Sequence, residues 1–129
     1  MSLLVLVVDD EPDVEVLFRQ QFRRDLRAGR FTIEFALDAQ KALKLIAHAR
    51  EATLILILSD INMPGMSGLE FLPLAKAARP DVPVIMITAY GDEATVKRAT
   101  ALGAAGLLPK PIDFSRLRQE IDQRLASAS

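Results

Sequence analysis

The sequence predicts a doubly wound α/β fold, in which helices cover both faces of a parallel sheet. Five short apolar runs alternate with helical patterns along the chain. Three of these runs are apolar at nearly every position, which is typical of parallel strands buried on both faces. The short connections favour βα units with right-handed crossovers. The five expected strands span residues 3–8, 31–36, 54–58, 82–88 and 105–108.

Five helices are expected to follow these strands. Pro12 suits a first helical turn, and apolar residues recur after it at three- and four-residue steps. Asp38 and Asp113 can cap the second and the last helix, and Gly103 can end the fourth. The third and fourth helices are expected over residues 67–78 and 91–103.

Length and composition are those of one globular domain. The chain has 129 residues, of which 50% are hydrophobic and 26% charged. We expect residues 3–126 to form the domain, and residues 127–129 to be a tail or the start of a lost linker. A net charge of −1 gives no overall attraction to nucleic acid or to an anionic membrane, so neither is an expected direct partner.

Other features of the composition restrict the location and the chemistry. The chain has no cysteine, which excludes disulfides and thiolate metal sites. No apolar stretch reaches the roughly 18 residues of a membrane-spanning helix. The first residues lack the basic segment and the cleavage site of a signal peptide. A cytoplasmic location is therefore expected.

Polar residues follow four of the five expected strands. Asp9 and Asp10 end the first strand, Asp60 ends the third, Thr88 the fourth and Lys110 the fifth. The carboxyl ends of parallel strands meet at one edge of the sheet, where ligands bind in such folds. These five residues, which are far apart in the sequence, are therefore expected to converge.

The converging residues have the chemistry needed for phosphoryl transfer. Asp9, Asp10 and Asp60 offer the hard oxygen ligands that Mg²⁺ prefers. Such an ion would neutralise carboxylates that otherwise repel one another. Asp60 suits a carboxylate nucleophile, while Lys110 and Thr88 can bind phosphoryl oxygens. The expected product is an aspartyl phosphate.

Four motifs occur in a family-like order and spacing, and they resemble those of the response-regulator receiver domain. They read VVDDEPD, SDINMPGMSGLEFL, ITAYG and LPKP, and the resemblance spans nearly the whole chain. It implies a flavodoxin-like fold with strand order 2-1-3-4-5. It also implies an output surface over the helix at residues 91–103, the fifth strand and the last helix. By resemblance, the protein is a phosphoacceptor of two-component signalling and a switch rather than a turnover enzyme.

The same resemblance implies a role for each site residue. Asp60 would be phosphorylated from the phosphohistidine of a sensor histidine kinase or a phosphotransfer protein. Asp9, Asp10, Asp60 and the main-chain carbonyl of Asn62 would hold Mg²⁺. Thr88 and Lys110 would bind the phosphoryl group. An output domain outside this chain and a stand-alone regulator are both compatible with the resemblance.

One position departs from the family pattern. Receiver domains usually have an aromatic residue three positions before the lysine, and its ring turns inward on phosphorylation. Leu107 stands there in this chain, and the single tyrosine is Tyr90. We expect coupling to the output surface without the usual rotating ring: either Leu107 or Tyr90 serves instead, or the switch is muted. Tyr90 is also large enough to shield an acyl phosphate, so slow self-hydrolysis is expected.

Three other functions are possible on this fold, and the sequence disfavours each of them to a different degree. A phosphorylation-independent interaction module on the same fold is favoured by Leu107 and disfavoured by the intact site. A nucleotide or flavin binder would need a phosphate-binding loop after the first strand, and DDEPD repels phosphate. A phosphatase of the haloacid dehalogenase type would need an aspartate where Asn62 stands.

Two further features of the sequence have no expected role at the site. Arg19, Arg23 and Arg27 form a stripe with four-residue spacing. This stripe can be a solvated face or a docking surface for an acidic partner, and both readings stay open. His48 is the only histidine, and a solvated role is expected for it.

Overall fold

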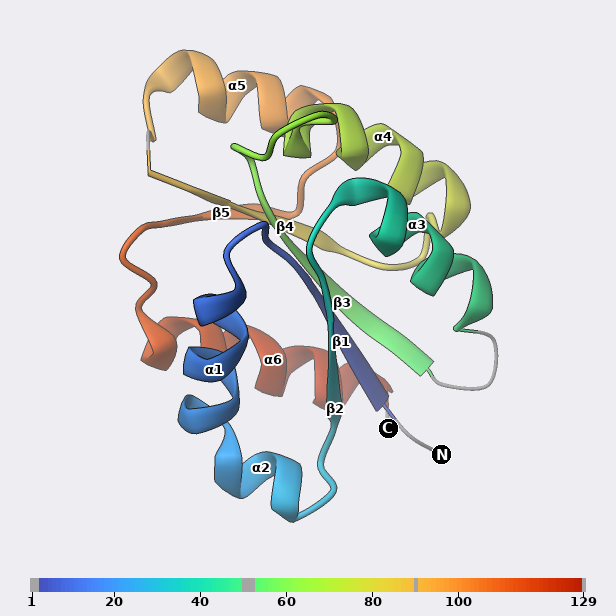
Figure 1. Ribbon diagram of the computed structural model, residues 1–129, viewed down its shortest axis with the longest axis vertical. Helices are drawn as coiled ribbons and strands as arrows, with labels where there is room; N and C mark the ends of the chain where they lie inside the picture. The colour runs from blue at the N-terminus through green and yellow to red at the C-terminus, as the bar shows by residue number, and fades with distance from the viewer. Residues whose placement is uncertain (1–2, 50–52, 90, 129) are drawn as a thin grey trace.

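The five strands form one parallel sheet in the order β2-β1-β3-β4-β5, which confirms the predicted topology (Figure 1). The computed structural model describes residues 3–49, 53–89 and 91–128. All four strand pairs are parallel, as the near-continuous apolar runs predict. The strands are β1 (Leu3–Val8), β2 (Thr32–Ala36), β3 (Thr53–Asp60), β4 (Val84–Thr88) and β5 (Gly106–Pro109).

The described residues form six helices rather than the expected five, because the first expected helix is divided at Phe22. Phe22 has φ −108° and ψ 19°, outside helical geometry, and its ring is fully buried. Apolar periodicity continues through the break, which is why the sequence gives no sign of it. The helices are α1 (Pro12–Gln21), α2 (Arg23–Arg27), α3 (Ala39–His48), α4 (Gly68–Ala78), α5 (Glu93–Ala101) and α6 (Phe114–Ala128).

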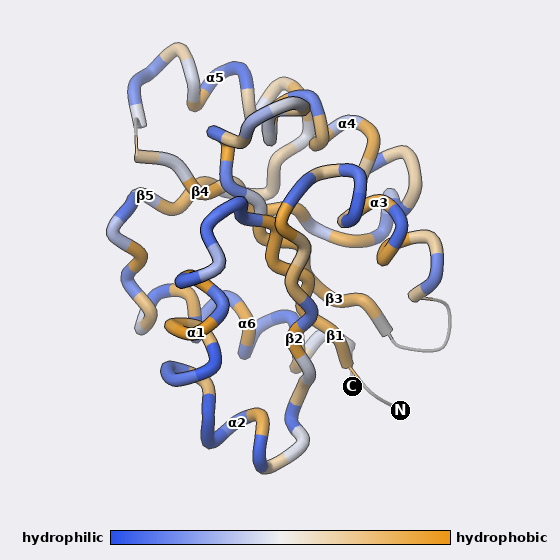
Figure 2. The backbone as a smooth tube through the Cα atoms, viewed as in Figure 1, coloured by the Kyte–Doolittle hydropathy of each residue, from blue (hydrophilic) through white to orange (hydrophobic). Residues whose placement is uncertain are grey.

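The helices form one layer on each face of the sheet (Figure 1). Helices α3, α4 and α5 cover one face, where Ala42, Phe71 and Ala99 pack in the same core cluster as Leu6. Helices α1, α2 and α6 cover the other. Figure 2 shows the resulting pattern, with hydrophobic strands at the centre and hydrophilic segments on the outer helices. None of the described helices has both the length and the apolarity needed to cross a membrane.

Phenylalanine rings fill much of the second core, between the sheet and helices α1, α2 and α6. Phe18 lies in α1 and Phe22 directly follows it. Both rings are fully buried, and both contact the ring of Phe114 on α6. Phe22 also packs edge-on against Phe31, which precedes β2. Such edge-to-face contacts are favourable beyond the area they bury. They hold the last turn of α1 against the first residue of α6.

Strand register brings the carboxyl ends of the strands together. Asp60 of β3 lies opposite Ile87 of β4, so the two strands end side by side. The Asp9 N–H donates to the Ala36 carbonyl at 3.0 Å, and the Lys110 N–H donates to the Thr88 carbonyl at 2.9 Å. The sheet therefore presents the residues after β1, β3, β4 and β5 at one edge.

Candidate functional site

Three carboxylates meet at this edge. Asp9 and Asp10 follow β1, and Asp60 is the last residue of β3. One carboxylate oxygen of each residue lies within 4.8 Å of the others. Asp9 is 4% exposed and Asp60 is 3% exposed, while Asp10 is half-buried. Negative charges this close and this far from water require a positive partner.

Lys110 supplies one positive charge to the cluster. Its ammonium Nζ donates to Asp60 Oδ2 at 2.9 Å and lies 4.0 Å from Asp9 Oδ2. The side chain leaves the end of β5 between Pro109 and Pro111 and stays 29% exposed. One ammonium facing three carboxylates leaves the cluster with a net negative charge.

Backbone N–H groups fix the orientation of two of the carboxylates. The Glu11 N–H donates to Asp9 Oδ1 at 2.9 Å, and the Asn62 N–H donates to Asp60 Oδ1 at 3.1 Å. Asp60 therefore accepts one bond from the backbone and one from Lys110, on different oxygens. Both carboxylates are held in place by the turns that follow their strands.

Burial and the neighbouring charges shift the pKa values of two groups in the site. Burial raises the pKa of Asp9, and the charge of Asp60 adds to this effect, against the opposing hydrogen bond from Glu11 and the charge of Lys110. Burial alone would lower the pKa of Lys110, but its hydrogen bond with Asp60 and the charges of Asp60 and Asp9 raise it. Lys110 therefore stays charged, and Asp9 resists ionisation.

Gly68 allows α4 to begin directly against the end of β3. A Cβ atom at this position would lie 2.1 Å from the main-chain oxygen of Asp60 and 2.8 Å from Ile61 Cα. The Gly68 N–H donates to the Ile61 carbonyl at 2.8 Å. Ser67 and Glu70 then form a capping box that starts the helix. The sequence marks Gly68 only as a turn residue, whereas the structure requires it for close backbone approach.

The remaining predicted site residues lie in or near the same edge. Thr88 ends β4 and is 2% exposed. Asn62 is exposed, and its N–H contacts the Asp60 carboxylate. Leu107 lies in β5 opposite Met86 and is partly buried. Tyr90 falls outside the described residues, so the expectation that it shields the site stays a prediction.

A cavity of about 200 Å³ opens from solvent beside Asp9 and Lys110. Its other walls come from the start of α1 and from the segment after β5. Leu17 of α1 is 40% exposed and lines this cavity, although the periodicity of the first helix predicts it on the buried face. The edge of the sheet is thus open to a reactant.

The donor set fits a divalent cation that prefers oxygen ligands. Asp9, Asp10 and Asp60 present carboxylate oxygens close enough for one ion to bind all three. The burial of Asp9 and Asp60 with a single ammonium leaves negative charge for the ion to neutralise. Mg²⁺ commonly binds to such clusters through few protein ligands and keeps several waters.

The family model for the response regulator receiver domain matches residues 5–122. This chain belongs to that family. Receiver domains are the signal-receiving parts of response regulators in two-component systems, so the expectations from the four motifs are confirmed at the level of family, fold and receiver function. The strand order seen here agrees with the one the family resemblance implies.

Curated relatives include both longer and similarly short proteins. The response regulator protein PilR of Pseudomonas aeruginosa is 37% identical over 88% of this chain, and the match covers 24% of PilR. The response regulator MprA of Mycobacterium ulcerans is 34% identical over 91% of this chain and 47% of its own length. The chain thus spans less than half of either protein. Sporulation initiation phosphotransferase F of Bacillus subtilis is 30% identical, over 97% of this chain and 95% of its own.

Solved structures of similar proteins have the same fold along nearly the whole chain. Chemotaxis protein CheY4 of Vibrio cholerae is 29% identical with a TM-score of 0.78, covering 95% of this chain and 98% of its own. The signal receiver domain of an HD domain-containing protein from Pseudomonas fluorescens Pf-5 is 27% identical with a TM-score of 0.83. That match covers 98% of this chain and 97% of the other.

Proposed function

We propose that this protein accepts a phosphoryl group on Asp60 from the phosphohistidine of a sensor histidine kinase or a phosphotransfer protein. One observation carries the proposal. The Asp60 carboxylate is buried at the open edge of the sheet, accepts a hydrogen bond from Lys110 at 2.9 Å, and shares one cluster with Asp9 and Asp10. Membership of the receiver family supports the same role.

Each residue of the site has a distinct task in this proposal. An Asp60 carboxylate oxygen attacks phosphorus, the bond from phosphorus to the donor's imidazole nitrogen breaks, and the imidazole leaves. Lys110 exchanges its bond to Asp60 for one to a phosphoryl oxygen. The Thr88 hydroxyl donates to another phosphoryl oxygen.

Asp9, Asp10, Asp60 and the main-chain carbonyl of Asn62 are the proposed Mg²⁺ ligands. When bound, the ion supplies charge neutralisation for the carboxylates and for the phosphoryl oxygens. Asp9 and Asp10 would hold the ion beside Asp60, because the three carboxylates lie within one cluster. Phosphoryl transfer then needs mainly positioning, which the backbone bonds to Asp9 and Asp60 provide.

The proposed product persists, which makes the protein a switch rather than a turnover enzyme. Asn62 stands two positions after Asp60, where an acid or base would be needed for rapid turnover, and an amide does not exchange protons in this way. Residues 3–126 are the proposed signalling unit. A cytoplasmic location belongs to the same proposal.

Labelling with radioactive acetyl phosphate and Mg²⁺ tests the proposed function. We expect labelling of the wild-type protein at one site, and complete loss of the label in Asp60→Asn. Asp13→Asn is the matched control, because Asp13 is an exposed aspartate just beyond the cluster. Equal labelling of Asp60→Asn and the wild-type protein would show that Asp60 is not the acceptor.

A phosphorylation-independent interaction module is the second candidate, and Leu107 favours it. A leucine has no ring that can swing inward from β5 when the site is phosphorylated. On this alternative, the face formed by α5, β5 and α6 binds its partner whether or not Asp60 carries a phosphoryl group. Partner affinity that is equal for the free protein and for its beryllofluoride complex would support this candidate over the switch.

A further inference from the structure

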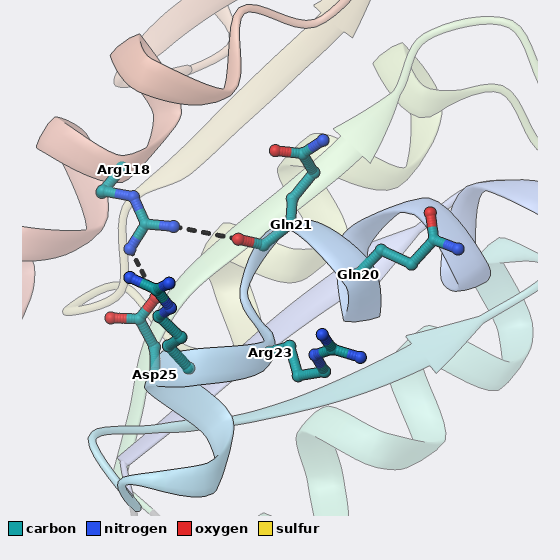
Figure 3. Close-up of a pocket in the computed structure, with 6 residues that line it drawn as sticks. Gln20, Gln21, Arg23, Asp25 and Arg118 are labelled. Carbon is teal, nitrogen blue, oxygen red and sulfur yellow. Dashed lines mark hydrogen bonds and ion pairs between the residues drawn. The ribbon is translucent and has the colours of Figure 1, made fainter.

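A second polar cavity lies where α1 and α2 meet α6, and it shares no lining residue with the Asp60 site. Its volume is about 470 Å³. Figure 3 shows Arg118 reaching from α6 toward the end of α1 and toward α2. Every lining residue is polar or charged: Gln20, Gln21, Arg23, Arg24, Asp25 and Arg118. Three arginines against one aspartate give these walls a net charge of +2.

The single carboxylate of the cavity is already neutralised. Asp25 is 5% exposed, and its two oxygens accept hydrogen bonds from Arg118 and Arg30. Burial by itself would raise the pKa of Asp25, but the hydrogen bonds and charges of the two arginines lower it. Asp25 therefore stays ionised within an excess of positive charge, and its neutralised carboxylate does not prevent an anion from binding in the cavity.

Arg118 is held in a fixed position at the wall of the cavity. Its guanidinium donates to Asp25 and, at 3.0 Å, to the main-chain carbonyl of Gln21 (Figure 3). It also lies over the Phe22 ring, 5.0 Å from the centroid. A guanidinium has five N–H donors in a planar fork, so Arg118 keeps donors for a further acceptor. Its side chain needs little further ordering to bind one.

Arg23 and Arg24 differ from Arg19 and Arg30, whose guanidinium groups pair with carboxylates. Arg19 pairs with Glu15 at 3.1 Å, and Arg30 pairs with Asp25 and Asp122. The side chains of Arg23 and Arg24 are exposed, and neither makes a hydrogen bond or ion pair within residues 3–49, 53–89 and 91–128. Two arginines that are neighbours in the sequence, and unpaired within the described residues, therefore add positive potential to the walls of the cavity.

We propose that this cavity binds a compact polyanion that carries two or more phosphate or carboxylate groups. Arg23, Arg24 and Arg118 pair with its oxygens, since the guanidinium fork matches both groups. Gln20 and Gln21 complete the polar lining. The lining contains no aromatic or aliphatic residue, so selection is by charge and size and not by a base or an acyl chain.

The volume of the cavity favours a small ligand over an acidic protein segment. A cavity of this volume falls in the range of small-molecule sites. Arg27, the last arginine of the stripe predicted from the sequence, does not line it. The structure therefore divides the stripe: Arg19 is paired, Arg23 faces the cavity, and Arg27 lies outside it.

Isothermal titration calorimetry with tripolyphosphate and with citrate tests the proposal. Omission of Mg²⁺ and constant ionic strength prevent binding at the acidic cluster and limit changes in screening. We expect saturable binding to the wild-type protein and at least tenfold weaker binding to the double variant Arg23→Gln/Arg24→Gln. Arg98→Gln/Arg116→Gln is the matched control, because it removes the same charge from exposed arginines outside the cavity. We expect the control to bind within twofold of wild type.

Three results would overturn the proposal. The first is heats of dilution alone for the wild-type protein, and the second is equally weakened binding in both double variants. The third is that neither small anion binds, whereas a hexaglutamate peptide binds and needs Arg23 and Arg24 to do so. The last result would make the cavity a protein-docking surface. In the wild-type protein, shifts of the Gln20 and Gln21 side-chain amide resonances on titration provide a second readout that needs no variant. Acetyl phosphate labelling of Asp60 does not depend on whether an anion binds in this cavity. This proposal and the proposed function can therefore fail separately.

Discussion

The surroundings of two buried aspartates, Asp60 and Asp25, differ in the ratio of carboxylates to cationic side chains. At the strand ends, Asp60 and two further carboxylates face one ammonium, that of Lys110. At α2, the single carboxylate of Asp25 faces two guanidinium groups, those of Arg30 and Arg118. The strand-end site raises the pKa of Asp9, whereas the α2 site lowers the pKa of Asp25. The first site is short of positive charge and suits a cation, and the second has an excess and suits an anion.

The two sites also differ in how the fold creates them. The strand-end cluster follows from topology, because parallel strands with right-handed crossovers bring their carboxyl ends together. The Asp25 cluster follows from packing. Asp25 lies three residues after the buried Phe22 and one before the partly buried Leu26, on the side of α2 that faces α6. A charged residue on this face needs partners from α6, and Arg118 provides one.

Replacement of Gly68 by alanine is the strongest expected disturbance of the strand-end site. The added Cβ would meet main-chain atoms of Asp60 and Ile61 that cannot rotate away. We expect the free energy of unfolding to fall by about 3 kcal/mol. Urea denaturation measures this change. Gly91→Ala is the control, since no described atom lies within 4 Å of its added Cβ; equal losses in the two variants would show that close approach at Gly68 is not the cause.

Mg²⁺ is expected to stabilise the strand-end site alone. At one hundred times its dissociation constant, a ligand that binds only the folded state adds about 2.7 kcal/mol to the free energy of unfolding. We expect this increment in the wild-type protein and in Asp25→Asn, and its loss in Asp10→Asn. Urea denaturation with Mg²⁺ or with EDTA measures it. If Mg²⁺ raises the free energy of unfolding of Asp10→Asn as much as that of the wild-type protein, the strand-end cluster is not the Mg²⁺ site.

The fold and the strand-end site could be predicted from the sequence because each depends on local signals. Uninterrupted apolar runs mark buried parallel strands, and the polar residue after each run marks the functional edge. Asp9, Asp60 and Lys110 therefore meet as predicted. Their assignment as metal ligands and phosphoacceptor machinery stays a prediction that the labelling and Mg²⁺ experiments test.

The division of the first helix and the Asp25 cluster had no comparable signal. The apolar spacing of Phe18, Phe22 and Leu26 is that of one continuous helix, and only the backbone angles at Phe22 reveal two. Asp25 and Arg118 are 93 positions apart, and each alone has the pattern of a surface residue. Pairing across such a distance depends on how α2 and α6 pack, which no short motif encodes.

Asp25→Asn is expected to weaken the α2 site in a pH-dependent way. The amide keeps the shape but loses the charge that Arg30 and Arg118 bind, so we expect a loss of about 2 kcal/mol at pH 7. The pKa of Asp25 in the folded protein lies below its ordinary value of 3.8. Its contribution is therefore complete above that value and is lost as the pH falls through the folded-state pKa.

The difference in unfolding free energy between the wild-type protein and Asp25→Asn should thus stay constant from pH 7 to pH 5 and shrink below the ordinary pKa of 3.8. Urea denaturation across this range measures it. Arg116→Gln serves as the control for removal of an exposed charge on α6. A difference that persists undiminished at the lowest pH would show that the charge of Asp25 is not what stabilises this region.

Leu107→Ala is expected to have the smallest effect, and it tests how the strand-end site communicates with α5 and α6. Leu107 is partly buried on the sheet face that α5 covers, so its truncation should cost about 1 kcal/mol. Because a leucine has no ring to swing inward, we expect beryllofluoride to shift the amide resonances of α5 and α6 equally in the variant and the wild-type protein. Disappearance of these shifts in Leu107→Ala would show that residue 107 is required for coupling. Their persistence would leave Tyr90 and the main chain that joins β4 to the end of β5, through the 2.9 Å hydrogen bond from the Lys110 N–H to the Thr88 carbonyl, as the candidates for coupling.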